Sequence, residues 1–229
     1  MNQSRKPKRR VTPKDEGMAR RHARGRVMLV DDDPGILLAY ARLLELEGYA
    51  CESFASAVAL LEELAAGKAR YPGPACILCD VDMPEITGLE LQQRLRLAAD
   101  MPIVLMSGAS AEHEVVQGFR GGAVDFLLKP IDIDELLRAV AKALALSAGH
   151  RARERERRAL EETFATLNAR ERTVMERIAL GETNQTIAGE LGVSLRSVKL
   201  YRQHVMEKTG ARNLPELVRM IDTMAGRSG

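Results

Sequence analysis

The chain of 229 residues contains no tryptophan, and phenylalanine and tyrosine together make up only 3% of it. A buried core must therefore consist of Leu, Val, Ile, Ala and Met. No apolar run approaches the roughly 20 residues that cross a membrane, and no apolar segment follows the basic N-terminus as in a signal peptide. We therefore expect a cytoplasmic protein that does not enter a membrane. Its length allows one large domain or two small ones.

Cysteine is also scarce, with only Cys51, Cys76 and Cys79 in the whole sequence. Cys76 and Cys79 form a CxxC pair, a spacing that in other contexts binds zinc or exchanges disulfides. Both lie in an apolar segment that we predict to be a strand, where residues three apart point to opposite faces. The sequence has no second CxxC and no close pair of histidines. We interpret the two cysteines as small buried apolar residues.

Charge is unevenly distributed, although the formal net charge is only +2. Residues 1–26 carry a net charge of +8, residues 27–145 of −10, and residues 166–229 of +3. An acidic block before a basic one suggests two modules, the first for cations and the second for nucleic acid. Residues 1–26 have almost no apolar side chains, so we predict a disordered basic arm. Contact with DNA phosphates is one alternative, and an over-long start before Met18 or Met28 is another.

Apolar and amphipathic segments alternate along residues 27–147. We predict strands that begin near Val27, Ala50, Cys76, Pro102 and Ala123. Helices are predicted at Pro34 to about Glu47, Ser56 to about Ala66, from Gly88, over 112–120, and from Asp132 past Leu144. The apolar face of the first helix is expected to contain Leu37, Leu38, Ala41, Leu44 and Leu46. Five strands alternating with five helices predict an α/β domain with a doubly wound, five-stranded parallel sheet.

Polar residues follow four of these strands. Asp31 and Asp32 follow the first strand, Asp80 ends the third, Ser107 ends the fourth and Lys129 follows the fifth. In a parallel sheet these ends share one edge, and carboxylates gathered there need a cation. Hard oxygen ligands with room for water suit Mg²⁺. Each residue alone could be a helix cap, a turn residue or a surface lysine, but together they predict a phosphoryl-transfer site with Asp80 as in-line nucleophile.

Residues 27–145 resemble the receiver domain of bacterial two-component response regulators, which has a flavodoxin-like fold. The matching motifs are Val30–Pro34, Cys79–Pro84 with Gly88, Met106–Gly108 and Asp125–Pro130. The resemblance implies that Asp80 is the phosphoacceptor and that Asp31, Asp32 and Asp80 bind Mg²⁺ together with the backbone carbonyl of Asp82. It also implies that Ser107 is the switch hydroxyl, Lys129 the phosphate-sensing cation, and Phe126 the aromatic residue that changes rotamer.

Two features depart from the receiver pattern. The loop over residues 67–74 looks longer than usual, and the side chain of Asp82 adds an acid beside the site. Asp80-Val81-Asp82 also matches the DxD motif of haloacid-dehalogenase-type phosphatases, which form the same aspartyl phosphate. In those enzymes the DxD comes first in the chain and the acidic pair last. Here the acidic pair comes first, and Pro84 stands where Thr or Val is expected, so the receiver interpretation is preferred.

The segment Gln185–Val198 has the pattern of a helix-turn-helix. Ile187, Leu191 and Val198 occupy packing positions, Gly192 makes the turn and Ser194 caps the next helix. That helix carries the polar or basic residues Lys199, Tyr201, Arg202, Gln203, His204 and Lys208, which suit the major groove of DNA. An ordinary solvated helix is the alternative interpretation. The flanking helices are predicted at Arg170–Leu180 and Pro215–Met224.

Residues 167–224 resemble the LuxR-type DNA-binding domain of NarL/FixJ regulators. The matching stretches are Leu167–Glu171, Gly181–Ala188, Ser197–Lys199 and Lys208–Ala211. The resemblance implies that Lys199, Leu200 and Gln203 approach base edges, and that Tyr201, Arg202 and the region of Asn184 lie near phosphates. Ser194 is also expected among the DNA-binding residues. Tyr201 stands where such domains often have His.

The predicted organisation is a basic arm (1–26), a receiver domain (27–147), a charged helical linker (148–166) and an all-α DNA-binding domain (167–229). In the linker, Leu160, Phe164 and Leu167 could form a narrow dimer seam, and an exposed helix is the preferred alternative. The resemblances imply a response regulator transcription factor, with no enzyme activity beyond its own phosphoryl transfer and dephosphorylation.

A sensor histidine kinase would phosphorylate this protein, and phosphorylation would control dimerisation and binding to double-stranded DNA. RNA polymerase is a further candidate partner. The alternative from another class is a phosphorylation-gated module whose C-terminal helices bind protein instead of DNA.

Overall fold

The structure, a computed structural model, describes residues 24–66, 73–98, 101–108 and 112–226. Most of the predicted basic arm, and the greater part of the loop over 67–74, therefore lie outside the described residues. The chain forms two units, Met1–Arg151 and Ala152–Gly229. The domain boundaries that we gave remain predictions. Among the helices of the described ranges, none combines the length and apolarity needed to span a membrane.

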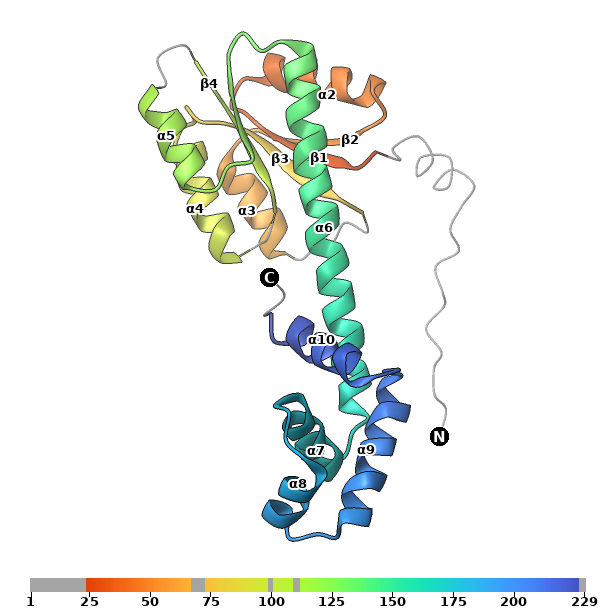
Figure 1. Ribbon diagram of the computed structural model, residues 1–229. Helices are drawn as coiled ribbons and strands as arrows, with labels where there is room; N and C mark the ends of the chain where they lie inside the picture. Colours follow the sequence, from red (N-terminus) through yellow and green to blue (C-terminus); the bar gives the residue numbers. More distant parts are fainter. Residues whose placement is uncertain (1–23, 67–72, 99–100, 109–111, 227–229) are drawn as a thin grey trace, which may run out of the picture. The chain divides into compact units, whose positions relative to one another are not determined.

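The first unit is built on a five-stranded parallel sheet (Figure 1). Its strands are β1 (Arg26–Val30), β2 (Ala50–Phe54), β3 (Ala75–Asp80), β4 (Ile103–Ser107) and β5 (Asp125–Leu128). Their order is β2-β1-β3-β4-β5, and every neighbouring pair is parallel. This order confirms the doubly wound, flavodoxin-like sheet, in which the strand order reverses between β1 and β3.

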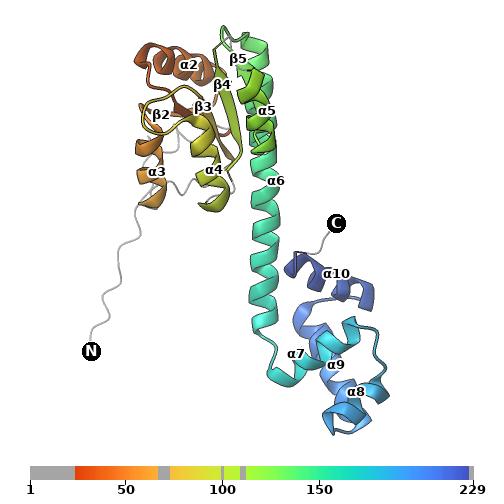
Figure 2. The ribbon, with the colours of Figure 1, turned by 90° about the vertical axis from the view of Figure 1, so that its left-hand side faces the viewer.

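Helices cover both faces of the sheet. They are α2 (Pro34–Leu46), α3 (Ala57–Ala65), α4 (Gly88–Ala98), α5 (Glu112–Arg120) and α6 (Ile133–Ala165). Helices α3 and α4 lie side by side in both views (Figure 1 and Figure 2), and they pack with Cys79 in one core cluster. Helices α2 and α6 pack with Cys76 in the other cluster. The two cysteines thus face opposite sides of β3 and are free thiols, as predicted.

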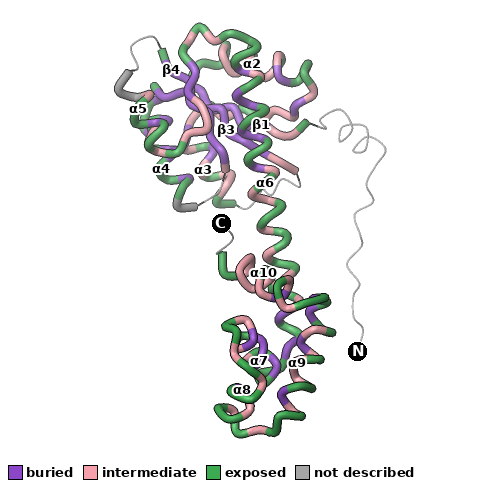
Figure 3. Tube along the Cα trace, in the orientation of Figure 1, coloured by how far each residue is buried: buried purple, intermediate pink, exposed green. Residues whose placement is uncertain are grey.

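The central strands β1, β3 and β4 are buried almost throughout (Figure 3), which is why they contain continuous apolar runs. The prediction for the apolar face of α2 is wrong at two positions. Leu44 is fully buried, but Leu38 is 55% and Leu46 is 87% exposed. Leu37, Ala41 and Leu44 follow the i, i+4, i+7 spacing of one helix face, and the other two leucines lie off that face.

The second unit is helical. It contains the C-terminal end of α6 and the helices α7 (Ala169–Ala179), α8 (Asn184–Leu191), α9 (Leu195–Thr209) and α10 (Leu214–Met224). Phe164 and Leu167 are buried in the core of this unit. The proposed dimer seam is therefore wrong for these two residues, because their apolar surface is already covered. Along α6, Glu154 forms ion pairs with Arg157 and Arg158, which support an exposed helix.

Candidate functional site

Four of the predicted residues meet at the carboxyl edge of the sheet. Asp31 directly follows β1 and is 1% exposed, and Asp80 is the last residue of β3 and is 4% exposed. Lys129, just after β5, reaches across to both acids. Its Nζ donates to Asp80 Oδ1 at 2.6 Å and to Asp31 Oδ2 at 3.0 Å. Ser107, at the end of β4, is 2% exposed beside them. The strand ends thus gather two carboxylates, one ammonium and one hydroxyl.

The pKa of the Asp80 carboxyl is raised, although a carboxylate paired with a lysine ordinarily has a lowered pKa. Burial raises the pKa of the Asp80 carboxyl above its ordinary value, with smaller contributions from Asp31 and Asp82, while the Lys129 ammonium acts in the opposite direction. For Lys129, desolvation lowers the pKa, but its hydrogen bonds to Asp80 and Asp31 outweigh this, so the pKa is raised. The lysine therefore stays charged at neutral pH and compensates the two buried acids.

The remaining predicted acids lie apart from the lysine. Asp32 is exposed. Asp31 Oδ1 accepts from the backbone N–H of Asp33 at 2.9 Å, and Asp33 caps α2. The Asp82 carboxylate accepts a hydrogen bond from the Ser107 hydroxyl, with Oγ 3.4 Å from Oδ2. The cluster around Lys129 thus contains two of the four predicted aspartates.

The donor set can be tested against the Mg²⁺ that the sequence implies. In the described part of the chain, no three Asp, Glu, His or Cys side chains are arranged to hold a metal ion. Asp31 and Asp80 nevertheless supply two hard carboxylates close enough to share one lysine. Mg²⁺ in proteins is commonly held by one or two carboxylates and keeps several waters. The residues present therefore fit Mg²⁺ with a small number of protein ligands.

Two further residues shape the site. A Cβ atom at Gly88 would lie 2.3 Å from the backbone oxygen of Asp80, so only glycine allows α4 to begin against this strand end. Phe126 is 8% exposed and belongs to the core. The rotamer change that the resemblance implies for Phe126 stays a prediction, and in this structure the ring is buried.

The second unit contains the predicted helix-turn-helix, formed by α8 and α9. Ile187 and Val198 are fully buried between the helices. Gly192 ends α8 in the left-handed conformation with φ of 63°, and Ser194 caps α9 by accepting from the Ser197 N–H at 3.0 Å. These contacts fix the angle between the two helices, as the sequence pattern indicates.

The predicted DNA-binding residues occupy different environments along α9. Lys199, Leu200 and Gln203 are exposed, and Gln203 Nε2 donates to Glu207 Oε1 at 2.8 Å. Tyr201 and Arg202 are half-buried. The Arg202 guanidinium donates to Asn184 Oδ1 at 3.1 Å, which links α9 to the first turn of α8.

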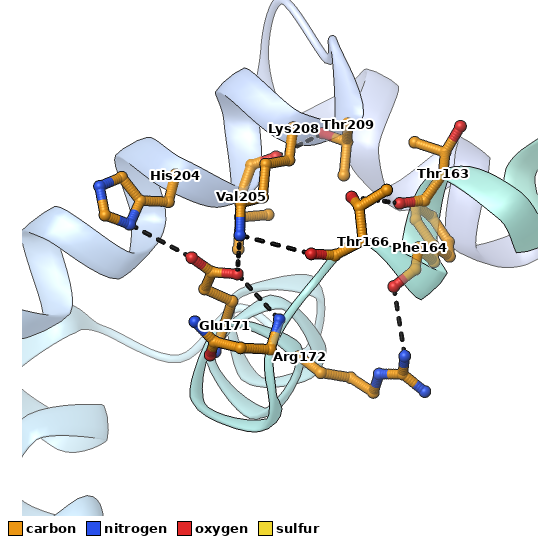
Figure 4. A network of polar contacts seen from close by, with 10 residues as sticks. Thr163, Phe164, Thr166, Glu171, Arg172, His204, Val205, Lys208 and Thr209 are labelled. Atoms are coloured by element: carbon orange, nitrogen blue, oxygen red, sulfur yellow. Dashed lines mark hydrogen bonds and ion pairs between the residues drawn. The ribbon is translucent and has the colours of Figure 1, made fainter.

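Two residues that we assigned to the polar surface of α9 contact the neighbouring helix instead (Figure 4). His204 Nδ1 lies 3.2 Å from Glu171 Oε1, and Lys208 Nζ donates to Glu171 Oε2 at 2.6 Å. Glu171 is 1% exposed and also accepts from the backbone N–H of Asn168 at 2.9 Å. Our reasoning missed Glu171, although Asn168 with Glu three residues later is the signature of a capping box.

A lysine bridging buried aspartates at the edge of a parallel sheet, and a helix-turn-helix with an exposed polar helix, together define a two-module regulator. Comparison with known proteins is consistent with this class. Residues 27–141 match the family of response regulator receiver domains. Residues 165–221 match the luxR family of bacterial regulatory proteins.

Individual proteins are similar to most of the chain. The chain is 40% identical over 195 residues to the transcriptional regulatory protein FixJ of Azorhizobium caulinodans, covering 85% of this chain and 90% of that protein. It is 36% identical to nodulation protein W of Bradyrhizobium diazoefficiens, with 86% of both chains covered. The solved structure of response regulator StyR aligns with a TM-score of 0.73 at 32% identity, covering 86% of this chain and 98% of that one.

The chain therefore belongs to the response regulators of the NarL/FixJ type. It is a transcription-regulating protein of the two-component class, and its family is not one of classical enzymes. The receiver domain implies a histidine kinase as partner, and the luxR-type domain implies binding to DNA.

Proposed function

We propose that Asp80 accepts a phosphoryl group from the partner histidine kinase, and that Asp31, Asp32, Asp80 and the backbone carbonyl of Asp82 hold Mg²⁺ during this step. The observation that carries the proposal is the bridge from Lys129 Nζ to Asp80 and Asp31. A buried nucleophilic carboxylate beside a cation is what in-line phosphoryl transfer needs. Bound Mg²⁺ would supply further neutralisation of the phosphoryl oxygens.

The chemistry of the step follows from these groups. A carboxylate oxygen of Asp80 attacks the phosphorus of a phosphohistidine, a P–O bond forms, and the P–N bond breaks with its electron pair on the imidazole. The Lys129 ammonium, already 2.6 Å from Asp80 Oδ1, then pairs with the new phosphoryl oxygens. The product carries a charge close to −2 where the carboxylate carried −1. That change attracts the Ser107 hydroxyl and reorganises the neighbouring surface.

We infer that this surface mediates dimerisation of the phosphorylated protein. Four large apolar side chains of α5, β5 and the start of α6 are about half exposed, namely Val116, Phe119, Leu128 and Ile133. Val116 and Phe119 lie on the helix that follows Ser107, and Leu128 and Ile133 lie on either side of Lys129 in the chain. A dimer would then bind paired half-sites on double-stranded DNA. RNA polymerase is a further proposed partner of the DNA-bound form.

In the DNA complex, Lys199, Leu200 and Gln203 would face base edges, since all three are exposed on α9. Asn184, Ser194, Tyr201 and Arg202 would lie near phosphates. The Arg202–Asn184 hydrogen bond supports this assignment, because it fixes the guanidinium at the junction of α8 and α9. Helix N-termini such as that of α9, capped by Ser194, also attract phosphate groups.

Labelling with a small phosphodonor tests the phosphorylation site. Wild-type protein with Mg²⁺ should gain one phosphoryl group by intact-protein mass spectrometry, and Asp80→Asn should gain none. Asp134→Asn, at an exposed position of α6, is the matched control and should be labelled like the wild type. Labelling of Asp80→Asn at the wild-type level would show that the nucleophile is a different residue.

Binding to operator DNA at several salt concentrations tests the second module. The double variant Lys199→Ala, Gln203→Ala should lose discrimination between specific and non-specific DNA, each lost base contact being worth about 1–3 kcal/mol. Wild-type affinity should fall steeply with added salt, because each phosphate neutralised releases counterions. Arg219→Ala on α10 is a control of equal charge loss. Affinity that is insensitive to salt would favour a protein ligand for the C-terminal helices.

A further inference from the structure

The hydroxyl of Ser107 is directed to a side chain that the proposed phosphorylation chemistry does not use. Its Oγ donates to Asp82 Oδ2 at 3.4 Å, while the only contacts of Lys129 Nζ described in the structure are to Asp80 and Asp31. Ser107 is 2% exposed, and Asp82 lies on the exposed side of the strand end. The Ser107 hydroxyl, which in the proposed switch must reach a phosphoryl oxygen, therefore donates a hydrogen bond to the Asp82 carboxylate in this structure.

The charge of Asp82 acts in the same direction. Asp82 is two residues from Asp80 in the chain, and its carboxylate contacts the Ser107 hydroxyl at the same strand edge, so it adds a negative charge beside the nucleophile. A phosphoryl group on Asp80 brings a charge close to −2 into the field of that carboxylate. Repulsion that disfavours one negative charge on Asp80 disfavours this larger charge more strongly.

We propose that Asp82 is a positioning residue that restrains the switch, because its carboxylate holds the Ser107 hydroxyl in the unphosphorylated state and repels the phosphoryl group. This proposal rests on the proposed phosphorylation of Asp80. It assigns the Asp82 side chain a role separate from that of its backbone carbonyl. Phosphorylation then requires the hydroxyl to exchange a carboxylate acceptor for a phosphoryl oxygen, and the acid sets how favourable that exchange is.

The inference predicts that removing the acid favours phosphorylation. Asp82→Asn keeps the shape and removes the charge, and Asp82→Ala removes the acceptor as well. Neither substitution deletes the backbone carbonyl proposed as an Mg²⁺ ligand. With phosphoramidate and Mg²⁺ below saturation, the ratio of phosphorylated to unphosphorylated protein should rise about threefold to tenfold, the size expected from one hydrogen bond. Glu62→Gln, which removes an exposed charge on α3, should leave the ratio unchanged.

A double-mutant cycle separates the restraint from simple repulsion. If Asp82 acts through the hydroxyl, the fold-increase in this ratio caused by Asp82→Ala should depend on Ser107. It should be at least two times smaller in a Ser107→Ala background than in the wild type. Equal increases in both backgrounds, or no increase in either Asp82 variant, would overturn the inference about Asp82. The proposed function would still stand in that case, provided that the wild-type protein is labelled. Failure of the wild type to be labelled at all would overturn both.

Discussion

The contact between Lys208 and Glu171 turns one side of α9 toward α7, away from the DNA contacts that we propose for Lys199 and Gln203. Lys208→Met removes the ammonium and keeps most of the aliphatic stem, so the carboxylate of Glu171 stays buried without its nearest cation. Lys199→Met is the matched change on the exposed side of the same helix. The two substitutions should affect different properties. Lys208→Met should lower the stability of the second unit, and Lys199→Met should lower DNA affinity.

The magnitude follows from the contacts of Glu171. Its side chain is 1% exposed, and Lys208 Nζ donates to it at 2.6 Å. Two donors remain after the substitution, the Asn168 N–H and the His204 ring. A hydrogen bond to a charged group contributes about 1.5–3 kcal/mol, and the 38% exposure of the Lys208 side chain argues for the lower part of that range. We expect a loss of about 2 kcal/mol.

Amide hydrogen exchange of the full-length protein provides the assay, because it reports on α7 and α9 separately from the receiver. A loss of about 2 kcal/mol lowers protection in these helices roughly 30-fold. Lys199→Met should leave it within about twofold of the wild type. If Lys208→Met left protection unchanged and weakened DNA binding as Lys199→Met does, the assignment of Lys208 to the helix interface would be refuted.

The same contact predicts a pH dependence. The hydrogen bond from Lys208 is the largest cause that lowers the pKa of Glu171 from its ordinary value of 4.5, followed by the backbone N–H of Asn168. A carboxyl with a lowered pKa stabilises the fold above pH 4.5, and this contribution is lost as the pH falls through the lowered value. Protection of α7 and α9 should therefore fall with acidification below pH 4.5, and it should fall less in Lys208→Met.

Three other predictions concern the receiver. Burial raises the pKa of Cys51 to about 12 and raises those of Cys76 and Cys79 as well, so a thiolate-directed reagent at pH 8 should label the protein only after denaturation. Gly88→Ala should destabilise the receiver by about 3 kcal/mol in thermal unfolding, because the added Cβ meets the Asp80 backbone oxygen. Phe119→Glu should abolish phosphorylation-dependent dimers in sedimentation analysis while phosphorylation itself stays at the wild-type level, since the half-exposed ring would place a charge in the proposed interface.

The sheet and its polar edge could be predicted because each strand ends abruptly in the sequence. An apolar run that stops at Asp80 or Ser107 indicates both a buried strand and the residue at its end, and parallel topology then brings the ends together. Spacing alone could not separate Asp31 from Asp32. Adjacent residues point in different directions, and only the folded chain shows that Asp31 is buried against Lys129 while Asp32 is exposed.

The polar surface of α9 was harder to predict because a list of polar residues does not specify a helix face. Val198 and Val205 are seven residues apart and fully buried, which defines the inner face of the helix. His204 and Lys208 flank that face and reach the buried carboxylate of Glu171. A helical projection anchored on the two valines would have placed both residues toward α7, and the capping-box pattern would have suggested their acceptor.

Two buried carboxylates with a lysine 2.6 Å away respond in opposite ways to their surroundings. The pKa of Glu171 is lowered because Lys208, the backbone N–H of Asn168 and His204 all favour its charged form. The pKa of Asp80 is raised because burial, Asp31 and Asp82 together outweigh Lys129. A carboxylate whose charge is fully satisfied is suited to holding helices together. One whose charge is incompletely compensated gains from a cation and from chemistry that changes its charge. The difference between these two acids lies in the balance of burial, neighbouring acids and donors, and it separates the structural acid of the second unit from the acid of the first unit that we propose to be phosphorylated.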